Sequence, residues 1–132
     1  MLKIKRPFYT AMIHHLQTVY PLEACGFLAG RDDTVEHIYA IDNILQSRTN
    51  YEMDAKQQLG AMLDMETNGW ELIAIFHSHP NGPQTPSETD IKLAYYPESI
   101  YLIISFEQKE RPIMRGFKIK DDNSSEIVWE LV

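Results

Sequence analysis

Apolar residues along the chain follow two patterns, one with the period of a β-strand and one with the period of an α-helix. Short apolar or alternating runs, each bounded by Gly, Pro, Asp or Asn, predict strands. These runs are residues 2–4, 25–29, 34–41, 71–76, 99–106, 111–119 and 126–132. Two longer stretches, residues 7–20 and 54–68, carry apolar side chains every three or four positions and predict helices.

The second of these helices, a third helix and the last turn can be placed from single residues. Asp54 can cap the second helix and Gly69 can stop it. Its apolar face is predicted to consist of Ala55, Leu59, Met62 and Leu63. The third helix is predicted to begin at Ser87 and to end at residues 95–97, and the polar residues 121–125 predict a turn between two strands.

The order of these elements is helix, hairpin, helix, strand, helix and further strands. This order predicts one mixed sheet with helices packed on its faces. The 132 residues are enough for one domain with a core of its own and too few for two. We therefore expect a single α/β domain that spans residues 1–132.

Two histidines stand at the end of the apolar run 71–76. His77 and His79 are two residues apart, so on a strand both imidazoles point to the same face. A loop rich in Pro and Gly follows, and Asp90 then falls in the first turn of the third helix. Two imidazoles and one carboxylate, with a fourth position left to water, commonly hold catalytic zinc. The spacing predicts a metal site; zinc suits hydrolysis at neutral pH best, and the residues leave iron, manganese and cobalt open.

Asp90 and Ser87 each have a second interpretation, because residues spaced as S-x-x-D can form a capping box at a helix start. The Asp90 carboxylate would then bond to the backbone amide of Ser87, and we expect this role to conflict with metal binding. Ser87 has no such conflict, since its backbone can begin the helix while its hydroxyl faces a substrate.

The stretch from His77 to Asp90 resembles the H-S-H-P…S-x-x-D signature of the JAMM (MPN+) metalloproteases. The matching residues are His77, Ser78, His79, Pro80, Ser87 and Asp90. Upstream, residues 20–30 resemble the P-x-E-x-C-G segment of the same family, with Glu23 at the place of its catalytic Glu. The similarity runs from about residue 20 to residue 105. The chain is compact, and its connection from Asp42 to Asp54 is too short for large extra recognition elements, so it looks like the small prokaryotic branch of the family.

The resemblance implies a fold and a set of roles. The fold is a three-layer α/β/α arrangement with a central mixed, largely antiparallel sheet, related to that of the cytidine deaminases. His77, His79 and Asp90 would bind one zinc ion per chain. Glu23, which taken alone is most simply a surface acid, would be the general base. Ser87 would help to stabilise the tetrahedral intermediate.

The resemblance also implies a zinc-dependent peptidase or isopeptidase that acts on the C-terminal tail of a ubiquitin-like or sulfur-carrier protein. Such a tail would lie extended in a groove, for which we expect Asn43, Tyr51 and Met53 to provide side chains. Two alternatives stay open. One is a non-catalytic module that binds a ubiquitin-like partner, and the other is a zinc hydrolase of a small amide or a cell-wall peptide.

Composition narrows the partners and the compartment. A net charge of −7 disfavours nucleic acid and anionic membranes as partners. No apolar run approaches the length that spans a bilayer, and the N-terminus lacks the pattern of a signal peptide. The single cysteine, Cys25, excludes an intrachain disulfide and suits a reducing compartment, while its apolar neighbours argue against a thiolate nucleophile. We expect a cytoplasmic protein; the sequence specifies no oligomeric state.

Overall fold

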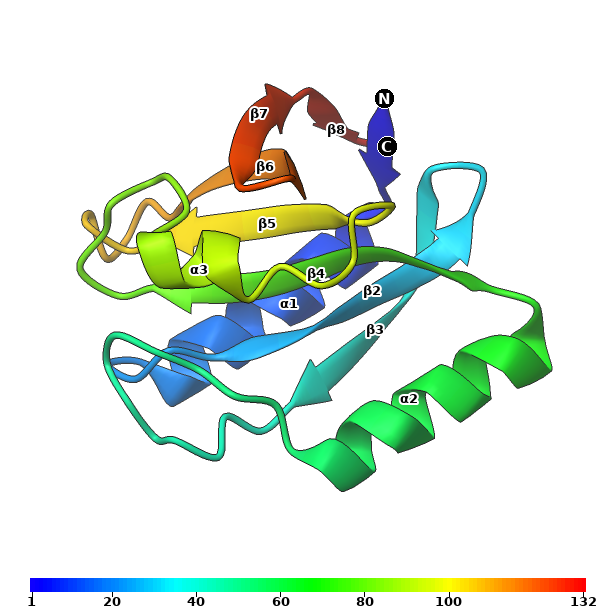
Figure 1. The fold of residues 1–132 in the computed structure, drawn as a ribbon, viewed down its shortest axis with the longest axis horizontal. Helices are drawn as coiled ribbons and strands as arrows, with labels where there is room; N and C mark the ends of the chain where they lie inside the picture. The colour runs from blue at the N-terminus through cyan, green and yellow to red at the C-terminus, as the bar shows by residue number, and fades with distance from the viewer.

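The computed structural model describes residues 1–132 and is organised around one mixed sheet of eight strands (Figure 1). The strands are β1 (Leu2–Ile4), β2 (Cys25–Arg31), β3 (Thr34–Ile41), β4 (Glu71–His79), β5 (Ile100–Ser105), β6 (Ile113–Lys120), β7 (Asn123–Ile127) and β8 (Trp129–Leu131). Their order across the sheet is β7-β6-β5-β4-β2-β3-β1-β8. The pairs β1–β3, β1–β8 and β4–β5 are parallel and the other four are antiparallel. The expected mixed, largely antiparallel sheet is confirmed.

Three helices cover the two faces of this sheet. Helix α1 (Arg6–Val19) packs on one face, and α2 (Ala55–Asn68) and α3 (Glu88–Lys92) lie over the other (Figure 1). Neighbouring residues of β4 contribute to both layers, because Phe76 belongs to the core beneath α1 and Ile75 to the core beneath α2. The three-layer α/β/α arrangement is therefore present as predicted. None of the three helices has the length and apolar character needed to cross a bilayer.

Helix α2 buries a different face from the one that its sequence pattern predicts. Leu59 and Leu63 are 60% and 56% exposed, whereas Ala61 and Met65 are buried against the sheet. The sequence offers two apolar stripes one residue apart, and they share Met62. The small side chain of Ala61 lets the helix approach the strands closely, so the stripe that contains it faces inward.

Helix α3 is shorter than predicted and ends at Lys92 instead of residues 95–97. The Leu93 and Ala94 amides donate to the carbonyls of Thr89 and Ile91, which closes the last turn. The Tyr96 amide then donates to the Tyr101 hydroxyl over 3.0 Å, so the chain after the helix is held against β5.

The C-terminal strand is divided in two, which the alternating pattern did not predict. Asp121 and Asp122 have φ of 53° and 61°, a two-residue hairpin turn, so β7 begins earlier than expected. After Val128 the chain leaves β6 and pairs with β1 at the opposite edge of the sheet. The two edges are thus joined through one residue, and the sheet curls so that the termini lie side by side (Figure 1).

Candidate metal centre

The last residues of β4 bring two imidazoles to one face of the sheet. His77 lies between its neighbours Cys25 on β2 and Ile103 on β5, and is 1% exposed; His79 is 5% exposed. Ser78 points to the opposite face, where its hydroxyl accepts a hydrogen bond from the Ala24 amide over 2.9 Å. The alternation predicted for these three residues is confirmed by these contacts.

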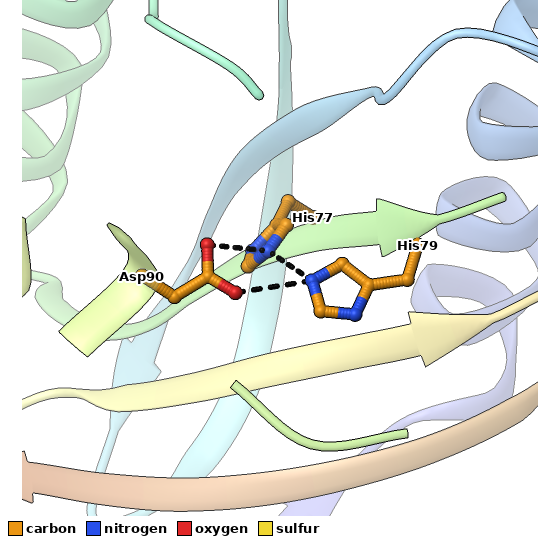
Figure 2. Close-up of side chains that lie close together, drawn as sticks. All are labelled: His77, His79 and Asp90. Carbon is orange, nitrogen blue, oxygen red and sulfur yellow. Dashed lines mark hydrogen bonds and ion pairs between the residues drawn. The ribbon is translucent and has the colours of Figure 1, made fainter. Parts of the chain in front are cut away.

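Asp90 reaches the same point from α3. Its Oδ1 lies 3.2 Å from His77 Nε2 and its Oδ2 lies 3.0 Å from His79 Nε2. The two Nε2 atoms are 3.0 Å apart, so all of these atoms converge on one small volume (Figure 2). The structure therefore assembles the three residues that the sequence proposes as ligands, from two elements that are separated by the Pro- and Gly-rich loop.

The donor set fits a metal ion. His79 Nδ1 donates to the Pro83 carbonyl over 2.8 Å, so a neutral His79 turns a bare lone pair at Nε2 toward Asp90 and His77. Such electron-rich groups repel one another unless a cation or protons lie between them. Donor atoms that bind one zinc ion at about 2.0–2.2 Å lie roughly 3.3–3.6 Å apart in a tetrahedron. The observed distances of 3.0–3.2 Å, in which each histidine faces a different oxygen of Asp90, are slightly shorter than that range.

The ionisation of Asp90 and His77 also suits a metal. Burial acts to raise the pKa of Asp90, but hydrogen bonds to His77 and His79 outweigh it and lower the pKa far below its ordinary value. Burial lowers the pKa of His77. Burial has the same effect on His79, but its bonds to Asp90 and to the Pro83 carbonyl leave the pKa raised overall. The site presents an ionised carboxylate beside a neutral imidazole at His77, and metal binding requires ligands in these forms.

Asp90 takes part in a helix cap and in the histidine cluster at the same time. Its Oδ2 accepts from the Ser87 amide over 2.8 Å, and its own amide donates to the Ser87 hydroxyl over 3.0 Å, which completes a capping box. Both carboxylate oxygens nevertheless face the histidines. The expected conflict with metal binding stays a prediction, but the geometry shows that a carboxylate oxygen, which has two lone pairs, can serve the helix and the histidines together. The cap fixes the carboxylate in place.

Glu23 is buried, with 4% exposure, although it follows the exposed end of α1. Its Oε1 has no hydrogen-bond partner. Burial raises the pKa of Glu23 to about 8; the charge of His79 acts to lower it and that of Asp90 to raise it further. Taken alone, Glu23 was most simply interpreted as a surface acid. In the structure it is instead a buried carboxyl group whose charge interacts with those of His79 and Asp90.

A cavity of about 490 Å³ opens beside Asp90. Tyr51 and Met53 line it as expected, and the Tyr51 ring lies 4.5 Å from that of His77. Asn43 does not line it. The wall also contains Leu93, Tyr95 and Tyr96, which the sequence analysis assigned to the third helix or its end. The aromatic pair just before Pro97 was the signal that could have marked them.

Cys25 lies on the face of the sheet that carries His77, yet it is not part of the cluster. Its thiol donates to the Ile41 carbonyl over 3.4 Å. Burial, with the charges of Glu23 and Asp42, raises the pKa of the Cys25 thiol to about 12. The thiol is therefore protonated at neutral pH, which agrees with the argument against a cysteine nucleophile.

Comparison with known proteins assigns the family. Residues 5–119 match the family described as prokaryotic homologs of the JAB domain. The chain belongs to this family. It is 34% identical to the CysO-cysteine peptidase of Mycobacterium tuberculosis, over 92% of this chain and 84% of that protein. It is 35% identical to the desampylase of Haloferax volcanii, over 64% of this chain and 63% of that protein.

A solved structure matches this chain over its whole length. Protein DSY2949 from Desulfitobacterium hafniense matches 100% of this chain, and 93% of that chain is covered, with a TM-score of 0.90 and 38% identity. Together these comparisons confirm the predicted family, its small prokaryotic branch and the predicted class of enzyme, a hydrolase.

Proposed function

We propose that this protein is a zinc-dependent peptidase that hydrolyses a peptide or isopeptide bond at the C-terminal tail of a ubiquitin-like or sulfur-carrier protein. The observation that carries the proposal is the convergence of His77, His79 and Asp90 within 3.0–3.2 Å of one another at the edge of an open cavity. The similarity to a CysO-cysteine peptidase and a desampylase supports the reaction class and this class of substrate.

His77, His79 and Asp90 are proposed as the ligands of one zinc ion per chain. Zinc bound there would supply a Lewis acid that polarises the scissile carbonyl and lowers the pKa of water. Asp90 is already ionised and is braced by the Ser87 amide, and His79 is oriented by the Pro83 carbonyl. The ligands therefore need little rearrangement to hold a cation.

Glu23 is proposed as the general base. It takes a proton from the attacking water and passes it to the departing amine. Both steps are favoured when the carboxyl pKa lies near the working pH, and burial raises the pKa of Glu23 to about 8. The three cluster residues are occupied as ligands, so a fourth group is needed for this proton.

Ser87 is proposed to stabilise the oxyanion that forms on the substrate carbonyl. Its oxygen accepts from the Asp90 amide, which leaves the hydroxyl proton free to donate. The Asp90 amide fixes the position of this oxygen, so the hydroxyl needs little reorganisation during the reaction.

The cavity supports a polypeptide tail as the substrate. Its lining is mostly apolar and includes Tyr51, Met53 and Tyr95. An extended tail that lies here would place its last carbonyl beside Asp90.

The first experiment measures metal content and cleavage together. Wild-type protein purified without chelators should carry about one zinc per chain and release the C-terminal tail of a ubiquitin-like fusion, while His79→Ala should lose both properties. Zinc binding without cleavage of tail fusions or small amides would indicate a binding module instead. Cleavage of small amides alone would favour the small-molecule hydrolase. Wild-type protein that binds no zinc after dialysis against it would contradict the proposal.

Two expectations from the sequence accompany this proposal. We propose that residues 1–132 act as one catalytic domain, which is supported by a single sheet whose strands run from Leu2 to Leu131. We also propose the cytoplasm as the working compartment, which is supported by the free thiol of Cys25.

A further inference from the structure

The carboxyl group of Glu23 makes no hydrogen bond, so contacts of the backbone fix its place. The Glu23 amide donates to the Ser47 carbonyl over 2.8 Å, and the Glu23 carbonyl accepts from Asn43 Nδ2 over 3.0 Å. The next amide, of Ala24, donates to the hydroxyl of Ser78 between the two histidines. The backbone around Glu23 is thus anchored to β4 through Ser78 and to the loop of residues 42–54 through Ser47 and Asn43.

The side chain of Asn43 holds that loop together through hydrogen bonds to its backbone. Its Oδ1 accepts from the amides of Leu45 and Glu52, each over 3.1 Å. Its Nδ2 donates to the carbonyls of Asn50 and Glu23, each over 3.0 Å. A carboxamide has two donor hydrogens and two acceptor lone pairs, so the side chain is saturated, and all four partners are backbone groups.

The same loop forms one wall of the cavity. Asn50, Tyr51, Glu52 and Met53 line it, and Asn43 holds this segment directly through the Asn50 carbonyl and the Glu52 amide. Asn43 also forms a β-bridge with Met53. Asn43 itself lies outside that cavity and lines a separate one of about 510 Å³ together with Glu23. A single side chain therefore joins the wall of the candidate substrate site to the backbone of Glu23, without facing the substrate.

We infer that Asn43 is a positioning residue that couples the cavity wall to the general base. A substrate that binds against the cavity wall and fixes its position also fixes the Glu23 carbonyl, because Asn43 bonds to both. The carboxyl group of Glu23 makes no hydrogen bond, so its position follows that of its backbone. This inference rests on the proposed function of Glu23, and a misplacement of about 1 Å at such a group can lower a rate on the order of a hundredfold.

The test is a double-mutant cycle with Asn43→Asp and Glu23→Gln. Asn43→Asp keeps the two acceptor bonds within the loop and removes both donor bonds, including the one to Glu23. With zinc content unchanged, kcat should fall about 10- to 100-fold and KM should change much less. In the Glu23→Gln background the same substitution should lower the residual kcat less than about threefold, because the group through which it acts is gone.

The control is Asn123→Asp, the same chemical change at an exposed hairpin residue. The side-chain Nδ2 of Asn123 donates to the Asp121 carbonyl. The substitution should leave kcat unchanged. If Asn43→Asp unfolds the protein, Asn43→Gln, which keeps the amide but lengthens the side chain, takes its place with the same expected cycle. An equal loss of kcat in both backgrounds, or a loss confined to KM, would overturn the inference.

Amide hydrogen exchange tests the physical link without any substrate. Asn43→Asp should speed exchange both in residues 43–53 and at residues 23–25, whereas Asn123→Asp should change neither. Faster exchange in the loop alone would show that Asn43 does not hold Glu23. A wild-type protein that binds zinc and cleaves nothing would contradict the proposed function instead, while the exchange result would still decide the coupling.

Discussion

Two carboxyl groups lie at or near this site, and their environments shift their pKa values in opposite directions. Glu23 and Asp90 are both largely removed from water, with side-chain exposure of 11% for Asp90 and residue exposure of 4% for Glu23. The pKa of Asp90 is lowered far below its usual value, whereas the pKa of Glu23 is raised to about 8. Burial acts on both in the same direction, so their partners make the difference.

Asp90 has two imidazoles and a backbone amide around its carboxylate, and these partners stabilise the charge. Glu23 has no hydrogen-bond partner at Oε1, so burial favours its neutral form. A ligand must stay ionised and fixed, and a base must exchange a proton near neutral pH. The two environments match these two tasks, a division also seen where paired carboxyl groups share one reaction.

Removal of the Asp90 charge should have the largest effect. Asp90→Asn keeps an oxygen that can accept from the Ser87 amide, but it removes the anion that faces His77 and His79. We expect zinc content to fall well below one per chain and tail cleavage to fall by on the order of 10⁴-fold or more. Elemental analysis beside a cleavage assay measures both.

Glu88→Gln is the matched control, since it removes one negative charge from the same helix at an exposed position. It should retain zinc and most of the activity. Full zinc occupancy in Asp90→Asn would show that Asp90 only caps the helix.

Glu23→Gln should separate the base from the ligands. The variant keeps the shape of the side chain and loses its ability to take a proton, so zinc content should be unchanged. The rate should fall about 10²- to 10⁴-fold, the usual contribution of a general base. A variant that retains the wild-type rate would remove Glu23 from the mechanism. The control is Glu66→Gln, which removes an acidic side chain at an exposed position of α2, away from the site, and should leave the rate unchanged.

The raised pKa of Glu23 predicts a dependence of stability on pH in the metal-free protein. The folded protein binds this proton more tightly than the unfolded chain, so its contribution is complete below pH 4.5 and is lost as pH rises toward 8. Relative to Glu23→Gln, the free energy of unfolding of the wild type should fall by on the order of a few kcal/mol across that window. Urea unfolding of both proteins from pH 4.5 to 8.5 measures this. A constant difference would mean that Glu23 is ionised throughout.

The clustering of the three proposed ligands could be predicted from sequence because their arrangement is local. Alternation on one strand places His77 and His79 together, and a helix start returns Asp90 after a loop of limited length. The environment of Glu23 could not be derived in this way. The burial of Glu23 depends on β4 and on the loop of residues 42–54, which come from distant parts of the chain. Only the family resemblance therefore singled out Glu23 as a candidate residue.

The fold shows the same limit. Strands with one clear pattern, such as residues 34–41, were placed correctly, because alternation is a property of the strand itself. The inward face of α2 depends on how closely Ala61 approaches the sheet, and the exchange of partners at Val128 depends on the curvature of the whole sheet. The cavity wall after α3 was missed for a related reason, since Tyr96 is held by Tyr101 of another element.

Tyr51 offers the smallest test, at the border between the ligand cluster and the cavity. Its ring covers His77 at 4.5 Å and lines the cavity, while its hydroxyl makes no hydrogen bond. Tyr51→Ala should raise KM about tenfold by removing an aromatic wall, and should lower zinc content only slightly, because the ligands keep their own bonds. Tyr51→Phe, which keeps the ring, should raise KM much less. Equal effects of the two substitutions would assign the role to the hydroxyl, and a loss of zinc in Tyr51→Ala would show that the ring supports His77 as a ligand.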